Sequence, residues 1–305
     1  MTFTEFFTVL ARDGRAPRDS WPADQRLEDF GLLEQGAWVI PAAPFDPLSA
    51  EEIRRGLSRR ARNWLVSLEV LPVVGSTNAE LMERARHAPV NGSLYTAELQ
   101  LSGRGRRGRR WMSPFGANLA ISMGIAVDRP AADLGGASLV VGLAALDALE
   151  QFGIDGLALK WPNDLLLNEA KLGGILIELA QAQGTELVVG LGLNVSLPDS
   201  ARRGLPDAVA DLASVAAAPE RSRLVAAITS SVVEFLDEFA RVGFVPFIPA
   251  FNQRHCYQGR ECQVLAGDGA QFGVVSGVAQ GGELILDTPE GPKNFHGGEV
   301  SLRRT

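Results

Sequence analysis

Between residue 48 and about residue 250, apolar runs typical of strands alternate with stretches of helical spacing, and this alternation restricts the possible folds more than any other feature. Strands are expected at 64–74, 92–98, 117–127, 157–162, 164–168, 172–181 and 186–195. Helices are expected at 50–61, directly after Ser76-Thr77-Asn78, at 137–151 and at 220–242. Because strands outnumber helices and several neighbours are joined by short turns, the sequence predicts an α+β fold. In this fold a mixed sheet carries its helices mainly on one face.

A small separate unit is expected at residues 1–47. Apolar residues at helical spacing begin at Phe3, and a second short helix is expected over 27–33. A short strand and a segment with three prolines follow, and this segment predicts an extended linker. Asp46 and Ser49 are candidates to cap the helix that comes next.

The last fifty residues have a different pattern, with no helical spacing. Four short strands separated by glycine-rich turns are expected at 261–266, 271–279, 283–288 and 292–295. This pattern predicts a small all-β barrel. The expected domains are therefore an N-terminal module at 1–47, a main domain at 48–256 and the barrel at 257–305.

The charge balance argues against a general nucleic-acid binder. The chain has 29 Lys and Arg residues against 36 Asp and Glu residues, a formal net charge of −7, whereas affinity for nucleic acid depends on neutralising phosphates. Residues 1–47 carry four basic and eight acidic side chains, which is the wrong sign for docking on DNA.

Several features together predict a soluble, cytoplasmic protein. The longest uncharged run, 111–127, is shorter than the roughly 20 apolar residues of a membrane-spanning helix and contains Pro114. The N-terminus lacks the basic region of a signal peptide. Cys256 and Cys262 can be paired or unpaired, but one possible bridge in a chain of this length favours a reducing compartment.

One glycine-spaced loop concentrates positive charge. The sequence Gly103-Arg-Gly-Arg-Arg-Gly-Arg-Arg-Trp111 places five arginines within seven residues. Glycines let a backbone approach a ligand closely, and each guanidinium offers a planar fork to a carboxylate or phosphate. The pattern therefore indicates an anion-binding loop, while a solvated basic loop or an RNA-binding Arg/Gly tract remains an alternative.

Three further segments combine polar groups with buried strands. Lys160-Trp-Pro-Asn163-Asp164 gathers polar side chains at a strand break, although Pro-Asn-Asp is also ordinary turn sequence. Lys171-Leu-Gly-Gly-Ile-Leu-Ile-Glu178 places a lysine beside two glycines, which suits an anionic ligand; a lysine with its head in water is the alternative. In Gly190-Leu-Gly-Leu-Asn194, alternate glycines clear one face of a strand, for a ligand or for close packing.

No other pattern points to a protein nucleophile or a protein-held transition metal. The histidines His87, His255 and His296 have no metal-ligand spacing with the cysteines. A nucleophile elbow, a Walker loop and a dinucleotide-binding loop in its proper context are also missing from the sequence.

The motifs, taken together, resemble those of biotin protein ligases. The likeness covers the arginine loop with Ser113-Pro-Phe-Gly-Ala-Asn-Leu119 after it, Lys160-Trp-Pro-Asn-Asp164, the segment from Lys171 to Glu178, Ser76-Thr-Asn78 and the tail from Gly297 to Arg303. The motifs occur in the family's order and spacing, over residues 48 to 305. The resemblance implies a sheet like that of class II tRNA synthetases, followed by an SH3-like C-terminal barrel.

The resemblance also implies the reaction. Members of the family form biotinyl-5′-AMP from biotin and ATP, with Mg²⁺ accompanying the nucleotide. They then transfer biotin to one lysine of a biotin carboxyl carrier domain, in acetyl-CoA carboxylase or another biotin-dependent carboxylase. The resemblance also allows for a homodimer, because family members often pair along sheet edges.

Roles for individual residues follow from the matched motifs. Lys171 and Arg104 are the expected catalytic residues. The expected biotin and adenylate site consists of Ser76, Thr77, Asn78, Gln100, Arg104, Gly105, Arg106, Lys171, Gly174 and Gly190. The expected nucleotide and acceptor side consists of Trp111, Lys160, Asn163, Asp164 and Asn194.

The N-terminus departs from part of the family. Bifunctional members carry a winged helix-turn-helix there and repress biotin-synthesis genes, but residues 1–47 are shorter than such a domain and acidic. We therefore expect a reduced module without specific DNA binding. Two alternatives remain open, namely a bifunctional ligase that is also a repressor, and a lipoate–protein ligase of the same superfamily.

Overall fold

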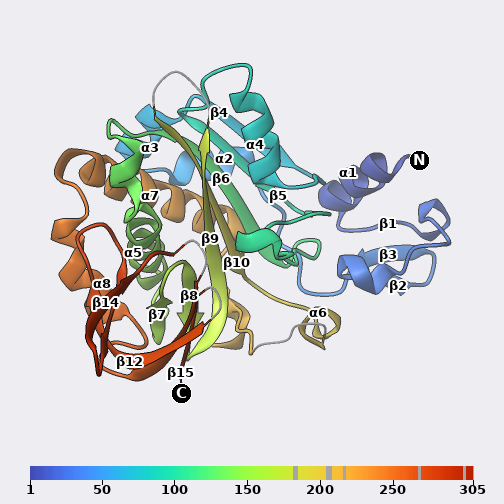
Figure 1. The fold of residues 1–305 in the computed structure, drawn as a ribbon. Helices are drawn as coiled ribbons and strands as arrows, with labels where there is room; N and C mark the ends of the chain where they lie inside the picture. The colour runs from blue at the N-terminus through green and yellow to red at the C-terminus, as the bar shows by residue number, and fades with distance from the viewer. Residues whose placement is uncertain (181–184, 204–207, 216–217, 267–268, 298–299, 305) are drawn as a thin grey trace.

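The computed structural model describes residues 1–180, 185–203, 208–215, 218–266, 269–297 and 300–304. At its centre is a seven-stranded sheet with the strand order β4-β5-β6-β10-β9-β8-β7 (Figure 1). The strands are β4 (Ser67–Leu71), β5 (Ser93–Ala97), β6 (Asn118–Ala126), β7 (Leu157–Lys160), β8 (Asp164–Leu167), β9 (Ala170–Ala180) and β10 (Glu186–Asn194). β4 and β5 run parallel and the other neighbours antiparallel, so the predicted α+β class with a mixed sheet is confirmed.

Helices cover the two faces of this sheet unequally. α5 (Ala137–Glu150) and α7 (Arg221–Val242) pack together on one face, with α2 (Ala50–Gly56), α3 (Arg59–Trp64) and α8 (Ile248–Arg254) beside them. α4 (Thr77–Ala85) lies on the opposite face, because Val188 of β10 packs with Leu81 of α4 while its neighbour Val189 belongs to the main core. A short helix, α6 (Asp199–Arg203), follows β10. Among the described residues, fewer helices therefore cover the face with α4 than the face with α5 and α7.

Two of the expected elements next to this sheet have different bounds. The helix expected at 50–61 is two helices, because the chain is extended at Leu57 and Ser58 caps α3 with its side chain. The strand expected at 64–74 is confined to β4, since Trp64 still belongs to α3. Ser49 caps α2 as expected. Asp46 does not; its carboxylate accepts instead from the backbone N–H of Arg221, at the start of α7.

The N-terminal unit consists of one helix and a three-stranded sheet. α1 (Phe3–Asp13) is followed by β1 (Ala16–Pro17), β2 (Leu32–Gln35) and β3 (Trp38–Pro41), in the order β1-β3-β2. The second helix expected over 27–33 is a single 3-10 turn, Leu27–Phe30. Gly31 has φ +73°, which ends that turn, and the next residue begins β2.

This unit packs directly on the segment that leads from β5 to β6. Phe7 and Trp21 are buried in one aromatic cluster with Phe115, and the rings of Phe7 and Phe115 lie 5.5 Å apart. The backbone N–H of Phe115 donates to the carbonyl of Phe30 at 2.9 Å. The unit is therefore attached to the domain of the central sheet by a shared core as well as by the linker.

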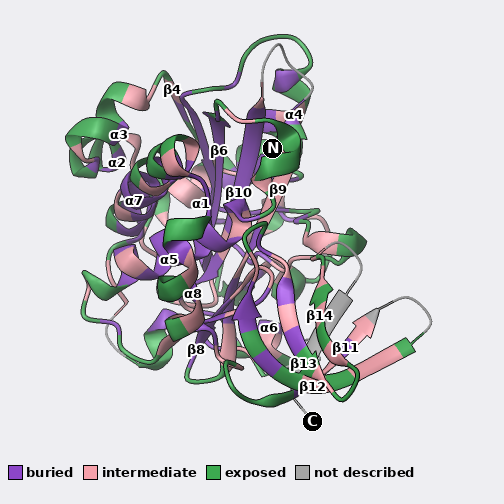
Figure 2. Cartoon of the chain, turned by 60° about the vertical axis from the view of Figure 1, so that its left-hand side comes forward, coloured by how far each residue is buried: buried purple, intermediate pink, exposed green. Residues whose placement is uncertain are grey.

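The C-terminal unit is a five-stranded antiparallel sheet in the order β14-β13-β12-β11-β15. Its strands are β11 (Glu261–Ala266), β12 (Gly269–Val278), β13 (Leu284–Thr288), β14 (Gly291–Phe295) and β15 (Val300–Arg304). β13 alternates between buried and more exposed residues (Figure 2). The sequence analysis found four of the strands and missed β15, a short segment ending in two arginines that pairs with β11.

Backbone and side-chain contacts join this unit to the central sheet. The indole N–H of the buried Trp161 donates to the carbonyl of Gly282 at 3.0 Å. The N–H of Cys256 donates to the carbonyl of Leu159 at 2.8 Å. Cys256 and Cys262 are not joined in a disulfide in the structure.

One helical stretch, 131–150, is long and apolar enough to span a membrane by composition. It contains α5, whose residues form much of the main hydrophobic core, and 67% of its most apolar window is buried inside the protein. The stretch is therefore a core helix of the fold.

A buried histidine between the central sheet and the C-terminal unit predicts a pH-dependent stability. His255 is 5% exposed and stacks on Phe251, and neither of its ring nitrogens has a hydrogen-bond partner among the described residues. Burial lowers the pKa of His255 to about 4, and the positive charge of Lys160 acts in the same direction. Because the unfolded chain binds this proton near pH 6.5, stability is lost as the pH falls from about 6.5 to about 4.

We expect the free energy of unfolding to drop by about 2 kcal/mol more in the wild type than in His255→Phe between pH 7 and pH 5. Urea unfolding of both proteins at the two pH values measures this difference. Val245→Ala, which removes no titratable group from an exposed position, is the control and should leave the pH dependence unchanged. An identical pH dependence in His255→Phe and the wild type would contradict the assignment.

Candidate active site

The face of the sheet with α4 has glycines where side chains from other segments approach it. Gly174 and Gly192 are paired across β9 and β10, and Gly190 lies two residues away on the same face. A Cβ at Gly190 would lie 2.3 Å from Asn78 Oδ1, and a Cβ at Gly192 would lie 2.6 Å from the Trp111 ring. Glycine at positions 190 and 192 therefore allows the start of α4 and Trp111 to rest on the strands.

The first residues of α4 form one wall of the site. Ser76 caps the helix with its side chain. The N–H and hydroxyl of Thr77 lie 3.0 and 3.2 Å from Gln100 Oε1. Ser122 Oγ, on β6, lies 2.8 Å from Thr77 Oγ1 and 2.5 Å from Asn78 Oδ1. These five side chains are all at least nine-tenths buried, so they form a fixed polar wall.

A carboxylate joins this wall to the arginine loop. Asn78 Nδ2 donates to Glu178 Oε2 at 3.0 Å, and Arg104 Nη2 approaches the same oxygen at 3.4 Å. The side chain of Arg104 is 45% exposed and that of Glu178 is 26% exposed. Glu178 therefore holds α4 and the loop together from the far end of β9.

The arginine loop folds back on itself through its backbone. The N–H of Gly105 donates to the carbonyl of Arg109 at 2.7 Å, and the N–H of Trp111 donates to the carbonyl of Gly103 at 2.8 Å. A Cβ at Gly103 would lie 2.5 Å from the carbonyl oxygen of Trp111, so a larger residue would push the two arms apart. The glycines thus permit the narrow hairpin that presents the arginines.

Two cations mark the other end of the site. Arg106 Nη1 donates to Asn163 Oδ1 at 3.0 Å, and Lys171 Nζ donates to Asp164 Oδ1 at 2.6 Å. Burial lowers the pKa of Arg106, and the negative charge of Asp164 opposes that shift. A Cβ at Gly174 would lie 3.8 Å from Lys171 Nζ, so the lysine crosses the glycine floor. This end is suited to binding an anion.

A buried amide network holds Met112, the residue after Trp111. Asn118 Nδ2 donates to the carbonyl of Met112 at 3.2 Å and to Asn194 Oδ1 at 3.0 Å. Asn194 Nδ2 donates in turn to the carbonyl of Ala210 at 3.0 Å. Both asparagines are almost fully buried, so this network holds the segment after the loop in one position.

The structure therefore brings the predicted site residues onto one face of the sheet, with one qualification. The Nζ atom of Lys160 lies 5.6 Å from the centre of the Tyr257 ring, so this side chain reaches toward the C-terminal unit. It also borders a cavity of about 10 Å³ together with Asn163 and Asp164. A cavity of this size has room for about one water molecule.

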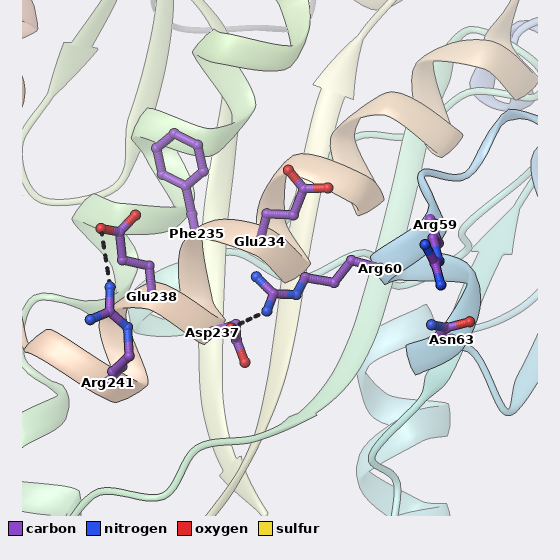
Figure 3. A pocket seen from close by; sticks show the side chains of 8 residues that line it. All are labelled: Arg59, Arg60, Asn63, Glu234, Phe235, Asp237, Glu238 and Arg241. Carbon is purple, nitrogen blue, oxygen red and sulfur yellow. Dashed lines mark ion pairs between the residues drawn. The ribbon is translucent and has the colours of Figure 1, made fainter.

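A much larger hollow lies elsewhere, between α3 and α7 (Figure 3). It encloses about 1010 Å³ and is open to solvent. Four of its charged groups form two ion pairs, Arg60 with Asp237 at 3.1 Å and Arg241 with Glu238 at 3.9 Å, and the other two, Arg59 and Glu234, are exposed. The side chains in these pairs are more than half exposed, so the hollow has no desolvated charge for a ligand and its size carries no functional argument.

Comparison with known proteins identifies the family. Residues 70–194 match the biotin/lipoate A/B protein ligase family, and residues 257–303 match the biotin protein ligase C-terminal domain. The bifunctional ligase/repressor BirA of Escherichia coli is 35% identical over 285 residues, which cover 92% of this chain and 86% of the relative. The chain belongs to the biotin protein ligase family. The model matched at 257–303 is named for biotin protein ligases alone, whereas the model matched at 70–194 is named for biotin and lipoate ligases together.

Other relatives of this biotin protein ligase agree. The biotin–[acetyl-CoA-carboxylase] ligase of Mycobacterium tuberculosis is 34% identical over 79% of this chain and 90% of its own length. The biotin protein ligase of Aquifex aeolicus, whose structure was solved in complex with biotin and ATP, superposes with a TM-score of 0.69. The superposition has 30% identity and covers 79% of this chain and all of that one.

Two residues of this site were missed by the sequence analysis. Ser122 contacts both Thr77 and Asn78, but a serine in a buried strand gives no signal without the fold. Glu178 ends a motif that was noted for its lysine and glycines, and it received no role. The only available signal was alternation along the strand, which places residue 178 on the same face as Gly174.

Proposed function

We propose that this ligase forms biotinyl-5′-AMP from biotin and ATP and then transfers the biotinyl group to a lysine of a biotin carboxyl carrier domain. The observation that carries the proposal is the two-ended site. The polar wall at Ser76, Thr77, Asn78 and Gln100 suits an uncharged ring with donors and acceptors. The cations Arg106 and Lys171 suit the carboxylate and phosphate that react.

In the first step a biotin carboxylate oxygen attacks the α-phosphorus of ATP, and pyrophosphate leaves. Two anions must approach each other, so positioning and charge stabilisation are the enzyme's main tasks. Lys171, which lies over the glycine floor, and Arg106, whose pKa is lowered by burial, supply positive charge at that end. We assign Lys171 as the catalytic residue of this step. Arg104, the second residue expected to be catalytic, lies beside Glu178 at the other end of the site, and we assign it to closure of the loop.

In the second step the amine of the acceptor lysine attacks the carbonyl carbon of the mixed anhydride, and AMP leaves. Asn163 and Asp164 stand beside Lys171 at the strand break, where the nucleotide and the acceptor would meet. Trp111 and Asn194 complete this side through the amide network behind the loop. Arg104, Gly105 and Arg106 cover the intermediate, and this cover shields the anhydride from water.

We propose that Mg²⁺ enters with the nucleotide. Within the described ranges, His, Cys, Asp and Glu side chains form no group of three or more that could hold a metal ion. The charge of the ion would add to that of Lys171 on the phosphate oxygens. The proposed partner is the carrier domain of acetyl-CoA carboxylase or another biotin-dependent carboxylase, and the proposed location is the cytoplasm.

Pyrophosphate exchange tests the first step. When the protein is incubated with ATP and labelled pyrophosphate, label should be incorporated into ATP if biotin is present. Lipoate at the same concentration should give no more incorporation than a reaction to which neither biotin nor lipoate is added. Exchange that depended on lipoate rather than biotin would overturn the proposal.

We also propose that the N-terminal module does not bind operator DNA. Residues 1–47 have a charge of four basic minus eight acidic groups, or −4, and phosphate contacts need the opposite sign. The buried aromatic side chains of the module also pack in one core with Phe115. A gel shift with biotin-operon DNA, with and without biotin and ATP, should show no specific complex. A biotin-dependent complex would make the protein a bifunctional repressor, as its relative in Escherichia coli is named.

A further inference from the structure

We infer that Glu178 is a positioning residue of the ligase site, which holds the arginine loop closed through Arg104. The inference deepens the proposed function, on which its kinetic part rests. Glu178 is the acceptor for two donors from different segments, Asn78 at 3.0 Å and Arg104 at 3.4 Å. It connects the fixed wall of the site to the movable cover.

Glu178 carries a negative charge in a site proposed for anionic substrates, so its effect on those substrates must be considered. Glu178 lies four residues beyond Gly174 along β9, which is roughly 13 Å at the usual rise of a strand. Because the Coulomb energy falls with distance, at this separation its charge opposes an anion bound near Lys171 less than it attracts Arg104 at 3.4 Å. Its cost at the reacting end is therefore small, and its local effect is to attract Arg104.

The wall that Glu178 uses does not move. Asn78 is 4% exposed, and its other side-chain atom lies 2.5 Å from Ser122 Oγ. A Cβ at Gly190 would overlap Asn78, so the amide is pressed against the sheet. Arg104, by contrast, is nearly half exposed and belongs to a hairpin with three glycines. Loss of the carboxylate should therefore release the loop and leave α4 in place.

The test replaces the charge and keeps the shape, as Glu178→Gln. Glutamine can still accept from Asn78, but it no longer attracts Arg104 by charge. In pyrophosphate exchange we expect the KM for biotin to rise roughly tenfold, as for the loss of one charged hydrogen bond. The kcat at saturating biotin should change less than threefold, because Glu178 is remote from the reacting atoms. Glu69→Gln, at an exposed carboxylate on β4, is the matched control and should leave both constants unchanged.

A second readout needs no enzyme activity. The loop offers five arginines to trypsin, and cleavage in native protein follows the population of the open form. Without substrates, cleavage between residues 104 and 110 should be roughly tenfold faster in Glu178→Gln than in the wild type. This measurement fails or succeeds independently of whether the ligand is biotin.

A double-variant cycle decides whether the effect passes through Arg104. In an Arg104→Gln background, Glu178→Gln should change the KM for biotin by less than twofold. A full tenfold effect in that background would overturn the inference, because Glu178 would then act by another route. Unchanged cleavage and unchanged KM in the single variant would overturn it as well.

Discussion

Replacement of Lys171 by alanine is expected to lower the rate of adenylate formation by about 10²- to 10³-fold, which is the cost of losing one charged group that stabilises a transition state. Lys171 Nζ lies over the glycine floor and 2.6 Å from Asp164 Oδ1. In the proposed reaction it meets a negative charge that grows as the carboxylate attacks phosphorus. The loss should therefore appear in kcat rather than in the KM for biotin.

The measurement is pyrophosphate exchange at saturating biotin and ATP. The chain has three lysines, and Lys293 on β14 offers a matched control, since it is 39% exposed and paired with Glu290. Lys293→Ala should exchange at the wild-type rate. Lys171→Ala also leaves Asp164 without its partner, so Asp164→Asn/Lys171→Ala should be measured with it. Normal exchange in Lys171→Ala would remove the lysine from the mechanism.

The sequence predicted those parts of the site that depend on local pattern. Gly190 and Gly192 were visible because alternate glycines in an apolar strand are unusual, and the structure gives the steric reason for each. The start of α4 was visible because Ser76 is a favourable cap. Ser76 caps the residues that follow it directly. The glycine pattern is also local, but the side chains that require it, Asn78 and Trp111, come from distant segments.

Contacts between distant segments left no such signal. Ser122 and Glu178 acquire their roles from residues 44 and 100 positions away in the sequence, through the pairing of strands with α4. Aspartate is a favourable residue type for capping, and Asp46 precedes the next helix. Its carboxylate accepts instead from the backbone N–H of Arg221 at the start of α7, 175 residues later in the chain. Local patterns indicate which residue types a position accepts, whereas the partner is set by the topology.

The site also depends on a buried ion pair that the sequence did not indicate. Arg221 and Glu98 are 2% and 3% exposed, and the guanidinium donates to the carboxylate through Nη1. Arg221 Nη2 also donates to the carbonyl of Asn118 at 2.8 Å, and Glu98 Oε1 accepts from the N–H of Leu48 at 2.7 Å. The pair therefore joins α7, the linker after the N-terminal module and both ends of the segment that carries Gln100 and the arginine loop.

Arg221→Met is accordingly expected to destabilise the protein by about 3–5 kcal/mol, because it leaves the Glu98 carboxylate buried without its counter-charge. The free energy and midpoint of urea unfolding measure the loss. Arg60→Met is the matched control: its partner Asp237 lies 3.1 Å away, but both side chains are more than half exposed, so the cost should stay below about 1 kcal/mol.

The double variant Arg221→Met/Glu98→Gln separates the charge from the packing. Removing both charges takes away the isolated carboxylate, so the double variant should be more stable than Arg221→Met alone. If Arg221→Met cost no more than Arg60→Met, the pair would not hold these segments together. If the double variant were only as stable as Arg221→Met, the damage would come from lost hydrogen bonds to the backbone of Asp46 and Asn118 rather than from the unpaired charge.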